Sequence, residues 1–416
     1  MSTTCVIIGG GYSGQAVAKN LVKAGVKVTI VQANPFAEQP IFGPYFLTRP
    51  ELYAAKANTK KGSVASLETV GIDGVSYVVG TVTSLGDDGD KTVVLEDGRT
   101  IEFGALVVAA GNHYPAIMAN LGEDFATRLA FVQAFPAKVS AANKILVGGA
   151  GPVALEMAAE LRRLNPTCEI QMVTSGDTAL SSWTGTPAAV LASRLKDTNI
   201  QVKTNARVVL PTGSAPAGVY EKAEYMLSTG EEVKDVDLFL PYFGQPRTGF
   251  LPADTVVGGK VRVNANGQST VRANLFAVGC GDRHPVAVMP VIDKEAEVVA
   301  ANVHALLGGQ DKLPASLPDK PPTEHVAVVH LGLGLWSAMN LEQKGCVPGL
   351  MARCCGCCFP ICPCCAFCDW CCTYPAGTCA GSCFEKVLIG MAGNFHEVHA
   401  VRKPEMQAFS AADMSR

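Results

Sequence analysis

The beginning of the chain follows a plan of apolar run, glycine turn and amphipathic stretch. The apolar residues Cys5–Ile8 lead into a turn rich in glycine, and the spacing of apolar residues beyond it predicts a helix over residues 15–24. A second apolar run, Val26–Val31, follows that helix. Short runs of branched apolar residues split by one helix are typical of parallel strands that are covered on both faces. The pattern therefore predicts a strand–helix–strand unit at the start of the chain.

The same pattern recurs about 140 residues further on, which is the spacing of one domain and too long for a short tandem repeat. Here the apolar run is Ile145–Val147, and after its glycine turn the periodicity predicts a helix over Val153–Leu164 and a strand over Glu169–Val173. The sequence therefore predicts an α/β protein with two Rossmann-like domains.

Shorter strands are predicted around these two units. Alternating or apolar segments around Asp-Gly turns predict a small β-meander that leads into a buried strand ending at Gly111. A similar meander follows the second unit, and a third apolar strand precedes Gly279 and a helix over about Ile292–Leu307. A sheet, a meander and helices together make a three-layer ββα domain. The segments are 76–85, 91–96, 100–103 and 105–111 for the first meander and its strand, 236–241 for the end of the second, and 274–278 for the third strand.

The first glycine turn has the spacing Gly9-x-Gly11-x-x-Gly14. In such a motif the first glycine permits a tight turn, the second lets the backbone approach a pyrophosphate, and the third lets helix and strand pack closely. The helix N-terminus then presents free N–H groups to the phosphates. The motif is weak alone, but its place between a strand and a helix is the context that supports dinucleotide binding.

The second turn, Gly149-x-Gly151-x-x-Ala154, has alanine at the third position, which the motif allows. Neither turn is followed by the acidic residue that usually binds a ribose hydroxyl about 20 positions later. Gln32 stands at that place in the first unit and Thr174 in the second. Gln32 can still hydrogen-bond a hydroxyl. The lack of an acid in the second unit leaves NADH and NADPH both open.

Composition excludes several classes of protein. The chain has 416 residues, 48% of them hydrophobic and 17% charged, as in a folded α/β enzyme of two or three domains. A formal net charge of −3 gives no reason to expect a nucleic-acid partner. We see no secretory signal, myristoylation start or apolar segment long enough to span a membrane, so a cytoplasmic protein is expected.

Taken in order, these motifs resemble those of the FAD-dependent pyridine nucleotide oxidoreductases. Within that family the chain looks closest to the ferroptosis suppressor / apoptosis-inducing-factor-homologous group, which is related to the type II NADH dehydrogenases. The resemblance spans about residues 4–335 and includes, besides the glycine turns, residues 107–111, 149–160, 237–247 and 274–282. It implies FAD on the first unit and NADH or NADPH on the second. Hydride would pass to the flavin and on to a quinone-like acceptor.

The resemblance also implies a division of the chain and roles for single residues. The FAD-binding domain would comprise residues 1–115 and 246–320, the NAD(P)H-binding domain residues 116–245, and a C-terminal region residues 321–416. Glu156 would lie near the flavin–nicotinamide contact and is the catalytic candidate, although an ordinary acid in the first turns of a helix is the alternative. The implied cofactor-binding residues are Gly9, Gly11, Tyr12, Ser13, Gly14, Gln32, Arg49, Val82 (whose backbone would hold the adenine), Ala110, Gly111, Gly149, Gly151, Ala154, Thr174, Gly279, Cys280 and Asp282.

Two departures from the family pattern concern the flavin. The family's second FAD motif ends in Gly-Asp, whereas Gly279 is followed here by Cys280, and Asp282 could take over if the loop is shifted. Cys280 is either a redox thiol beside the flavin or, as a lone cysteine more commonly is, a small buried residue. With Gln32 also changed, a non-catalytic, membrane-tethered nucleotide sensor or scaffold with weakened FAD binding is the alternative function. Residues 35–60 contain no cysteine, so the C-x(4)-C pair of disulfide-reducing relatives is missing.

Twelve of the 16 cysteines lie between Cys354 and Cys383, within a Cys-rich segment at 346–384. S-acylation is one explanation, because thiols among aromatic and apolar residues could attach the protein to the periphery of a membrane. Metal binding is a second, suggested by C-x-x-C spacings such as Cys355/Cys358, although the cluster contains no histidine and few cations. A loop of unmodified thiols is the third. We expect acylation and no metal.

Overall fold

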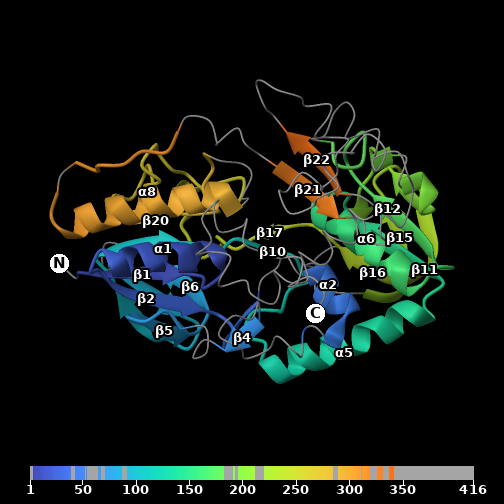
Figure 1. Ribbon diagram of the computed structural model, residues 1–416, viewed down its shortest axis with the longest axis horizontal. Coiled ribbons are helices and arrows are strands. Elements are labelled where there is room, and N and C mark those ends of the chain that lie inside the picture. Colours follow the sequence, from blue (N-terminus) through green and yellow to red (C-terminus); the bar gives the residue numbers. More distant parts are fainter. Residues whose placement is uncertain are drawn as a thin grey trace, which may run out of the picture.

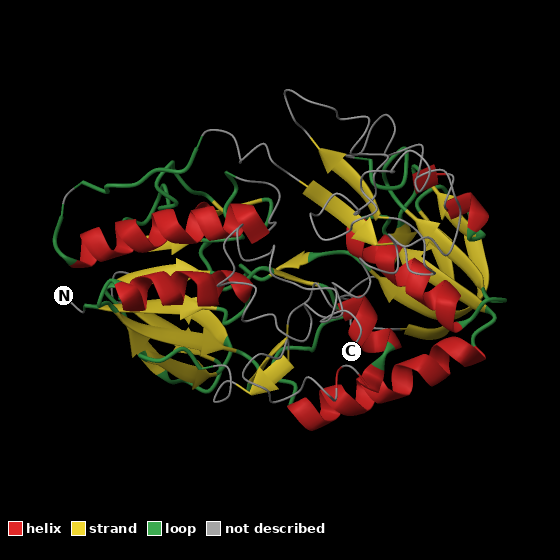
Figure 2. Ribbon diagram, viewed as in Figure 1, coloured by secondary structure: helices red, strands yellow, loops and turns green. Residues whose placement is uncertain are grey.

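The computed structural model describes most of the chain up to residue 318 and two later strands. The described residues are 3–38, 43–51, 53, 64–66, 71–86, 91–181, 191–192, 195–210, 220–283, 289–310, 312–318, 326–330 and 337–341. Two groups of sheets and helices lie side by side, with the first part of the chain in one and the middle part in the other (Figures 1 and 2). The Cys-rich segment lies outside the described residues.

The first group is built on a five-stranded parallel sheet with the order β20-β9-β1-β2-β5. Its strands are β1 (Thr4–Ile8), β2 (Lys27–Gln32), β5 (Val75–Val79), β9 (Ala105–Val108) and β20 (Leu275–Ala277). Helices α1 (Tyr12–Lys23) and α8 (Met289–Leu307) lie together along it (Figure 1). The meander, a separate three-stranded sheet, consists of β6 (Val82–Leu85), β7 (Thr92–Leu95) and β8 (Thr100–Glu102).

Alternation along β1 explains the layering. Cys5 and Ile7 belong to the apolar cluster that contains residues of α1 and α8, whereas Val6 and Ile8 belong to the cluster that contains residues of the meander. Successive side chains of a strand point to opposite faces, so one buried strand serves both clusters. The helices and the meander therefore cover opposite faces, which is the expected three-layer ββα arrangement.

Three boundaries differ from those that the sequence predicts. Residues 75–79 form the edge strand of the parallel sheet, with Val28 opposite Val75, instead of the start of the meander. Alternation alone could not decide between these two sheets. Helix α1 begins at Tyr12, three residues earlier than expected, because Gly11 is already its extended N-cap residue. Helix α8 begins at residue 289 instead of about 292.

The second group contains a six-stranded mixed sheet with the order β13-β12-β11-β16-β15-β14. The neighbouring strands β13, β12, β11 and β16 are parallel to one another. Strands β15 and β14 follow β16 in the sheet, pair antiparallel, and form the second meander. The helices are α5 (Phe125–Ala141), which follows the N-cap residue Asp124, and α6 (Pro152–Leu164). The strands are β11 (Lys144–Gly148), β12 (Glu169–Val173), β13 (Ile200–Lys203), β14 (Val208–Val209), β15 (Tyr220–Leu227) and β16 (Glu232–Pro241).

Smaller elements connect the two groups. The short strands β10 (Asn112–His113) and β17 (Gln245–Pro246) pair antiparallel where the chain crosses between the groups. Helix α2 (Gly43–Thr48) contacts α5 and α6, so a segment that follows β2 joins the core of the second group. The expected domain limits stay a prediction. The remaining elements are β3 (Phe36–Glu38), β4 (Val64–Ser66), η2 (Ala253–Thr255), β18 (Val256–Val257), β19 (Lys260–Val261), β21 (Val326–His330) and β22 (Ser337–Leu341). Among the described helices, none has the length and hydrophobicity of a membrane span.

Candidate active site

The first glycine turn lies at the carboxyl end of β1 and has the close approaches that its motif requires. Gly9 has a φ of 103°, and its N–H donates to the carbonyl of Val31 over 2.9 Å. A Cβ at Gly14 would overlap the carbonyl oxygen of Gly9, whereas a Cβ at Gly11 would meet no atom within 4 Å. The turn is therefore closed behind and open at Gly11. The first N–H groups of α1, including those of Tyr12 and Ser13, have no intrahelical partner, and this combination fits a phosphate group.

Two glutamine side chains hold the middle of this turn. The Oε1 atom of Gln32 accepts a hydrogen bond from the buried Gly10 N–H at 2.6 Å, and the Nε2 atom of Gln15 donates to the Gly10 carbonyl at 3.0 Å. Gln32 therefore uses its carbonyl oxygen on the protein's own backbone. Its NH₂ group and the second lone pair of Oε1 are left for the ribose hydroxyl that the sequence assigns to it.

The second flavin motif has two variable residues, Cys280 and Asp282, and the structure describes the surroundings of both. Burial above all raises the pKa of the Cys280 thiol to about 12, and the S–H donates to the Val108 carbonyl at 3.2 Å. Cys280 is therefore a buried neutral thiol, and the redox-thiol alternative loses support. The Oδ1 atom of Asp282, an exposed residue, accepts a hydrogen bond from the Val263 N–H at 3.0 Å. The expected contact of Asp282 with the cofactor stays a prediction.

Sequence reasoning missed the acid that does serve this motif. The Oε2 atom of Glu295, which is only 5% exposed, accepts a hydrogen bond from the Gly279 N–H at 2.7 Å. Gly279 has a φ of 72°, and a Cβ there would lie 2.5 Å from the Ser13 Oγ atom. Glu295 thus fixes the loop against the start of α1. The sequence gives only a weak signal for it, because Glu295 is one of three acidic residues, with Asp293 and Glu297, between Ile292 and Val299 of the predicted helix.

Tyr12 also links α1 to α8. Its hydroxyl donates to the Asp293 carboxylate at 2.8 Å, and its ring packs against the cores of both groups of sheets and helices. Burial raises the pKa of Asp293. Val82, 9% exposed, packs in the same cluster as Val31 at the end of β2, beside Ala110, while Gly111 has a φ of 62° and open space around it. The residues predicted to bind FAD, apart from Arg49, thus lie near one another at the carboxyl end of the parallel sheet.

The second glycine turn repeats the geometry of the first. The Gly149 N–H donates to the Val173 carbonyl at 2.7 Å, and the φ of Gly149 is 114°. A Cβ at Gly151 would again meet nothing within 4 Å, and Ala154 is buried behind it. Thr174 lies at the end of β12, where its N–H donates to the Lys203 carbonyl at 2.9 Å. This turn therefore fits a second dinucleotide, again without an acidic ribose ligand.

Glu156 lies one turn beyond Pro152 on α6 and is partly buried. Burial, and after it the charge of Glu156, raises the pKa of Tyr242, which places the carboxylate near that ring. The Tyr242 N–H donates to the Gly148 carbonyl at 2.8 Å, and its buried hydroxyl has no hydrogen-bond partner among the described residues. Glu156 therefore lies near the second turn, and its expected position at the flavin–nicotinamide contact is untested. Its catalytic role stays a prediction.

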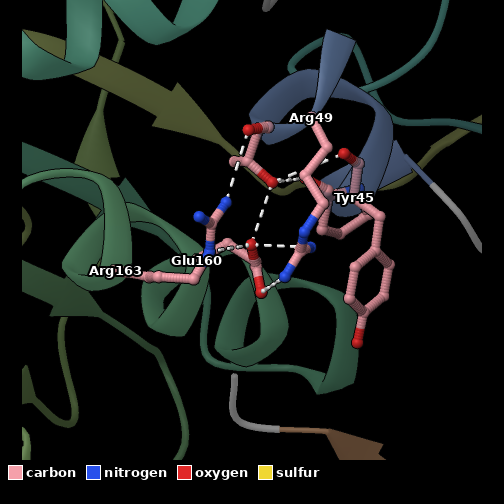
Figure 3. Close-up of polar contacts among 6 residues, drawn as sticks. Tyr45, Arg49, Glu160 and Arg163 are labelled. Atoms are coloured by element: carbon pink, nitrogen blue, oxygen red, sulfur yellow. Dashed lines mark hydrogen bonds and ion pairs between the residues drawn. The ribbon is translucent and has the colours of Figure 1, made fainter. Parts of the chain in front are cut away.

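Arg49 belongs to a buried polar cluster between α2 and α6 (Figure 3). Its Nη1 atom lies 2.9 Å from Oε2 of Glu160, which also receives the Arg163 Nε–H at 2.9 Å and the Thr48 hydroxyl at 3.0 Å. The Glu160 side chain is 1% exposed, and the Arg49 guanidinium lies over the Tyr45 ring. Arg49 thus joins two helices. Its expected contact with a cofactor stays a prediction.

A family model described as pyridine nucleotide-disulphide oxidoreductase matches residues 3–288. The chain belongs to this family. Membership confirms the α/β fold with Rossmann-like regions and confirms FAD and NAD(P)H as the cofactors expected from the sequence. The two glycine turns, each closed behind and open at its second glycine, agree with this assignment.

The individual proteins that the chain resembles share less than a third of its residues in the aligned regions. The chain is 28% identical over 324 residues to the oxidoreductase ptaL of Pestalotiopsis fici, an alignment that covers 74% of this chain and 85% of that protein. It is 28% identical over 177 residues to ferroptosis suppressor protein 1 of Taeniopygia guttata, covering 42% of this chain and 44% of that protein. The sulfide:quinone oxidoreductase of Aquifex aeolicus superposes with a TM-score of 0.58 at 17% identity over 81% of this chain and 83% of that one, which shows the fold alone.

The family's name refers to disulphide substrates, but no redox pair of cysteines is found among the described residues. The described cysteines, Cys5, Cys168 and Cys280, are free and buried. No group of His, Cys, Asp and Glu side chains in the described ranges could hold a metal ion.

Proposed function

We propose that this oxidoreductase passes hydride from NAD(P)H to FAD and then electrons from the flavin to a quinone-like acceptor at a membrane. The observation that supports a small acceptor is the lack of a cysteine pair near the first glycine turn: residues 35–60 hold none, and Cys280 is a buried neutral thiol. Electrons would therefore pass from the flavin to the acceptor without a cysteine pair in this part of the chain as an intermediate. The alignment with ferroptosis suppressor protein 1 and the fold shared with a sulfide:quinone oxidoreductase agree with this choice.

The chain's residues would bind and orient the two nucleotides. FAD, when bound, supplies the hydride acceptor and the store of two electrons. The open backbone at Gly11 and the N–H groups of α1 would hold its pyrophosphate, and Gly151 with the start of α6 would do the same for NAD(P)H. Glu156 would lie close to the nicotinamide, where its carboxylate can accept a hydrogen bond from the carboxamide.

We further propose that the chain belongs to the ferroptosis suppressor / apoptosis-inducing-factor-homologous group and is a cytoplasmic protein held at the periphery of a membrane by S-acylation of its Cys-rich segment. The support is the sequence: thiols lie among Phe359, Ile361, Phe367 and Trp370. A quinone dissolved in lipid requires the flavin to be close to a membrane.

The test of the catalytic proposal uses the purified full chain. We expect bound FAD and NAD(P)H-dependent reduction of a short-chain quinone, with no reduction of glutathione disulfide. Bound FAD with no quinone reduction would contradict the acceptor. For the membrane, hydroxylamine should release the protein from the membrane fraction of its host cells. If the protein is soluble and carries no thioester-linked lipid, the acylation proposal fails, and stoichiometric zinc or iron would favour the metal-binding alternative.

A second function, a membrane-tethered nucleotide sensor without catalysis, has one specific observation in its favour. Neither of the usual carboxylate positions holds a carboxylate: Gln32 stands at the first, with its Oε1 atom bound to the Gly10 N–H, and the buried thiol of Cys280 stands at the second. A purified chain that binds NAD(P)H but cannot be loaded with FAD would favour the sensor.

A further inference from the structure

The two strands that cross between the groups place their residues between the two glycine turns. Strand β10 begins directly after Gly111, at the carboxyl end of β9, and β17 begins directly after Gly244, which follows β16. They pair antiparallel, and Figure 1 shows them between the two groups of sheets and helices. Ligands of parallel sheets bind at the carboxyl ends of the strands. The β10–β17 crossover is therefore where the reacting ends of the two nucleotides would meet.

Arg247, directly after β17, is joined to this crossover through both its backbone and its side chain. Its N–H donates to the Gly111 carbonyl at 3.3 Å, and its Nη2 atom lies 2.6 Å from Nδ1 of His113. The Nε atom is buried without a hydrogen-bond partner among the described residues. No described acidic side chain forms an ion pair with this guanidinium.

The surroundings of Arg247 are electrostatically unbalanced. Burial, and then the charges of Arg247 and Arg128, lowers the pKa of His113 to about 4, so this imidazole is neutral and Nδ1 accepts from the guanidinium. Burial lowers the pKa of Arg247 itself to about 10. The charge of Arg128 is compensated by Glu38 at 2.9 Å. A partly buried charge is normally paired, and among the described side chains the Arg247 guanidinium has only a neutral histidine as a partner.

We infer that Arg247, oriented by His113, stabilises the negative charge that the flavin ring gains when it accepts hydride. This inference rests on the proposed function. When the C4–H bond of NAD(P)H breaks, the hydrogen leaves with both electrons, so NAD(P)⁺ is formed and the flavin gains one hydrogen and one negative charge. Mass and charge balance without a proton. A guanidinium fixed at the crossover supplies the missing counter-charge without giving up a proton of its own.

Sulfite tests this inference without any NAD(P)H or acceptor, because its addition to an oxidised flavin leaves a negative charge on the ring and bleaches the visible absorbance. The variants are R247Q, R247K and H113Q, with R99Q as a matched control on an exposed arginine that pairs with Asp97. We expect R247Q to raise the sulfite Kd by about 10- to 100-fold, the effect of one charge a few ångströms away at an intermediate effective dielectric constant. R247K, which keeps the charge, and R99Q should stay within about threefold of the unmodified chain.

Each outcome decides the question. Equal sulfite binding by R247Q and the unmodified chain overturns the inference, and so does a full chain that cannot be loaded with FAD. If R247Q instead raises only the KM for a sulfonated naphthoquinone and not that for its neutral analogue, Arg247 binds an anionic acceptor and the inference is wrong. If R247Q does not fold, H113Q decides, with an expected rise that is smaller than that for R247Q but above that for R99Q. Arg247-dependent sulfite binding without quinone reduction would retain the inference and reject the proposed acceptor.

Discussion

Replacing Gln32 tests how the first glycine turn is held. Its Oε1 atom is the hydrogen-bond acceptor for the buried Gly10 N–H, at 2.6 Å. In Gln32→Leu this N–H loses its partner, at a cost of about 1–3 kcal/mol. Bound FAD holds the turn in this conformation through its phosphates, so this cost reduces the free energy of FAD binding. The Kd for FAD should therefore rise about 5- to 150-fold. In Gln32→Glu a charged acceptor replaces a neutral one, which should contribute about 1 kcal/mol and tighten binding about fivefold.

The assay is titration of the apoprotein with FAD, followed by quenching of flavin fluorescence. Gln201→Leu, at an exposed position of the edge strand β13, is the matched control and should leave the Kd unchanged. If Gln32→Leu binds FAD within about twofold of the unmodified chain, the hydrogen bond to Gly10 does not hold the turn, and the reasoning is refuted.

Other substitutions test the buried polar contacts. Glu160→Gln should lower the free energy of unfolding, measured in urea, by about 2–4 kcal/mol, because Arg49 and Arg163 lose the charge of their buried partner. The control Glu232→Gln, in an exposed ion pair, should lower it by less than about 0.5 kcal/mol. Equal losses in the two variants would contradict this prediction. The pKa of His113 is about 4 in the fold against an ordinary 6.5, so the stability from its neutral form is present above pH 6.5 and is lost as the pH falls toward 4. Solvent screening keeps this fall in the free energy of unfolding below about 3 kcal/mol. Urea unfolding at pH 6.5 and at pH 4 should show a smaller fall for His113→Gln than for the unmodified chain. Because burial raises the pKa of Cys280 to about 12, iodoacetamide at pH 8 should leave it unlabelled in peptide mass maps of the native chain, and rapid labelling would show an accessible thiolate.

The strands, the helices and both glycine turns could be predicted because they depend on local properties. Gly9 and Gly149 adopt positive φ angles that favour glycine, and the apolar runs have the length of buried strands. Contacts between distant segments could not be predicted in this way. The direction of the Gln32 amide depends on Gly10, and the role of Glu295 depends on where α8 meets Gly279.

The positions of residues 75–79 and of Arg49 also depend on contacts between distant segments and could not be predicted. Alternating residues fit either the meander or the edge of the parallel sheet, and only the pairing of Val75 with Val28 decides. Arg49 is drawn into the second group by Glu160, more than a hundred residues away in the chain. The neutral state of Cys280 follows from its burial, which the sequence motif does not reveal.

The central claim is that one chain holds both nucleotides and passes hydride between them. The most direct measurement mixes the FAD-loaded full chain with NADH or NADPH in the absence of oxygen and of any acceptor, and follows the visible absorbance of the bound flavin. The account predicts that at least one of the two nucleotides bleaches the flavin with a stoichiometry of one per FAD. Bound FAD that stays oxidised in the presence of both nucleotides would contradict it.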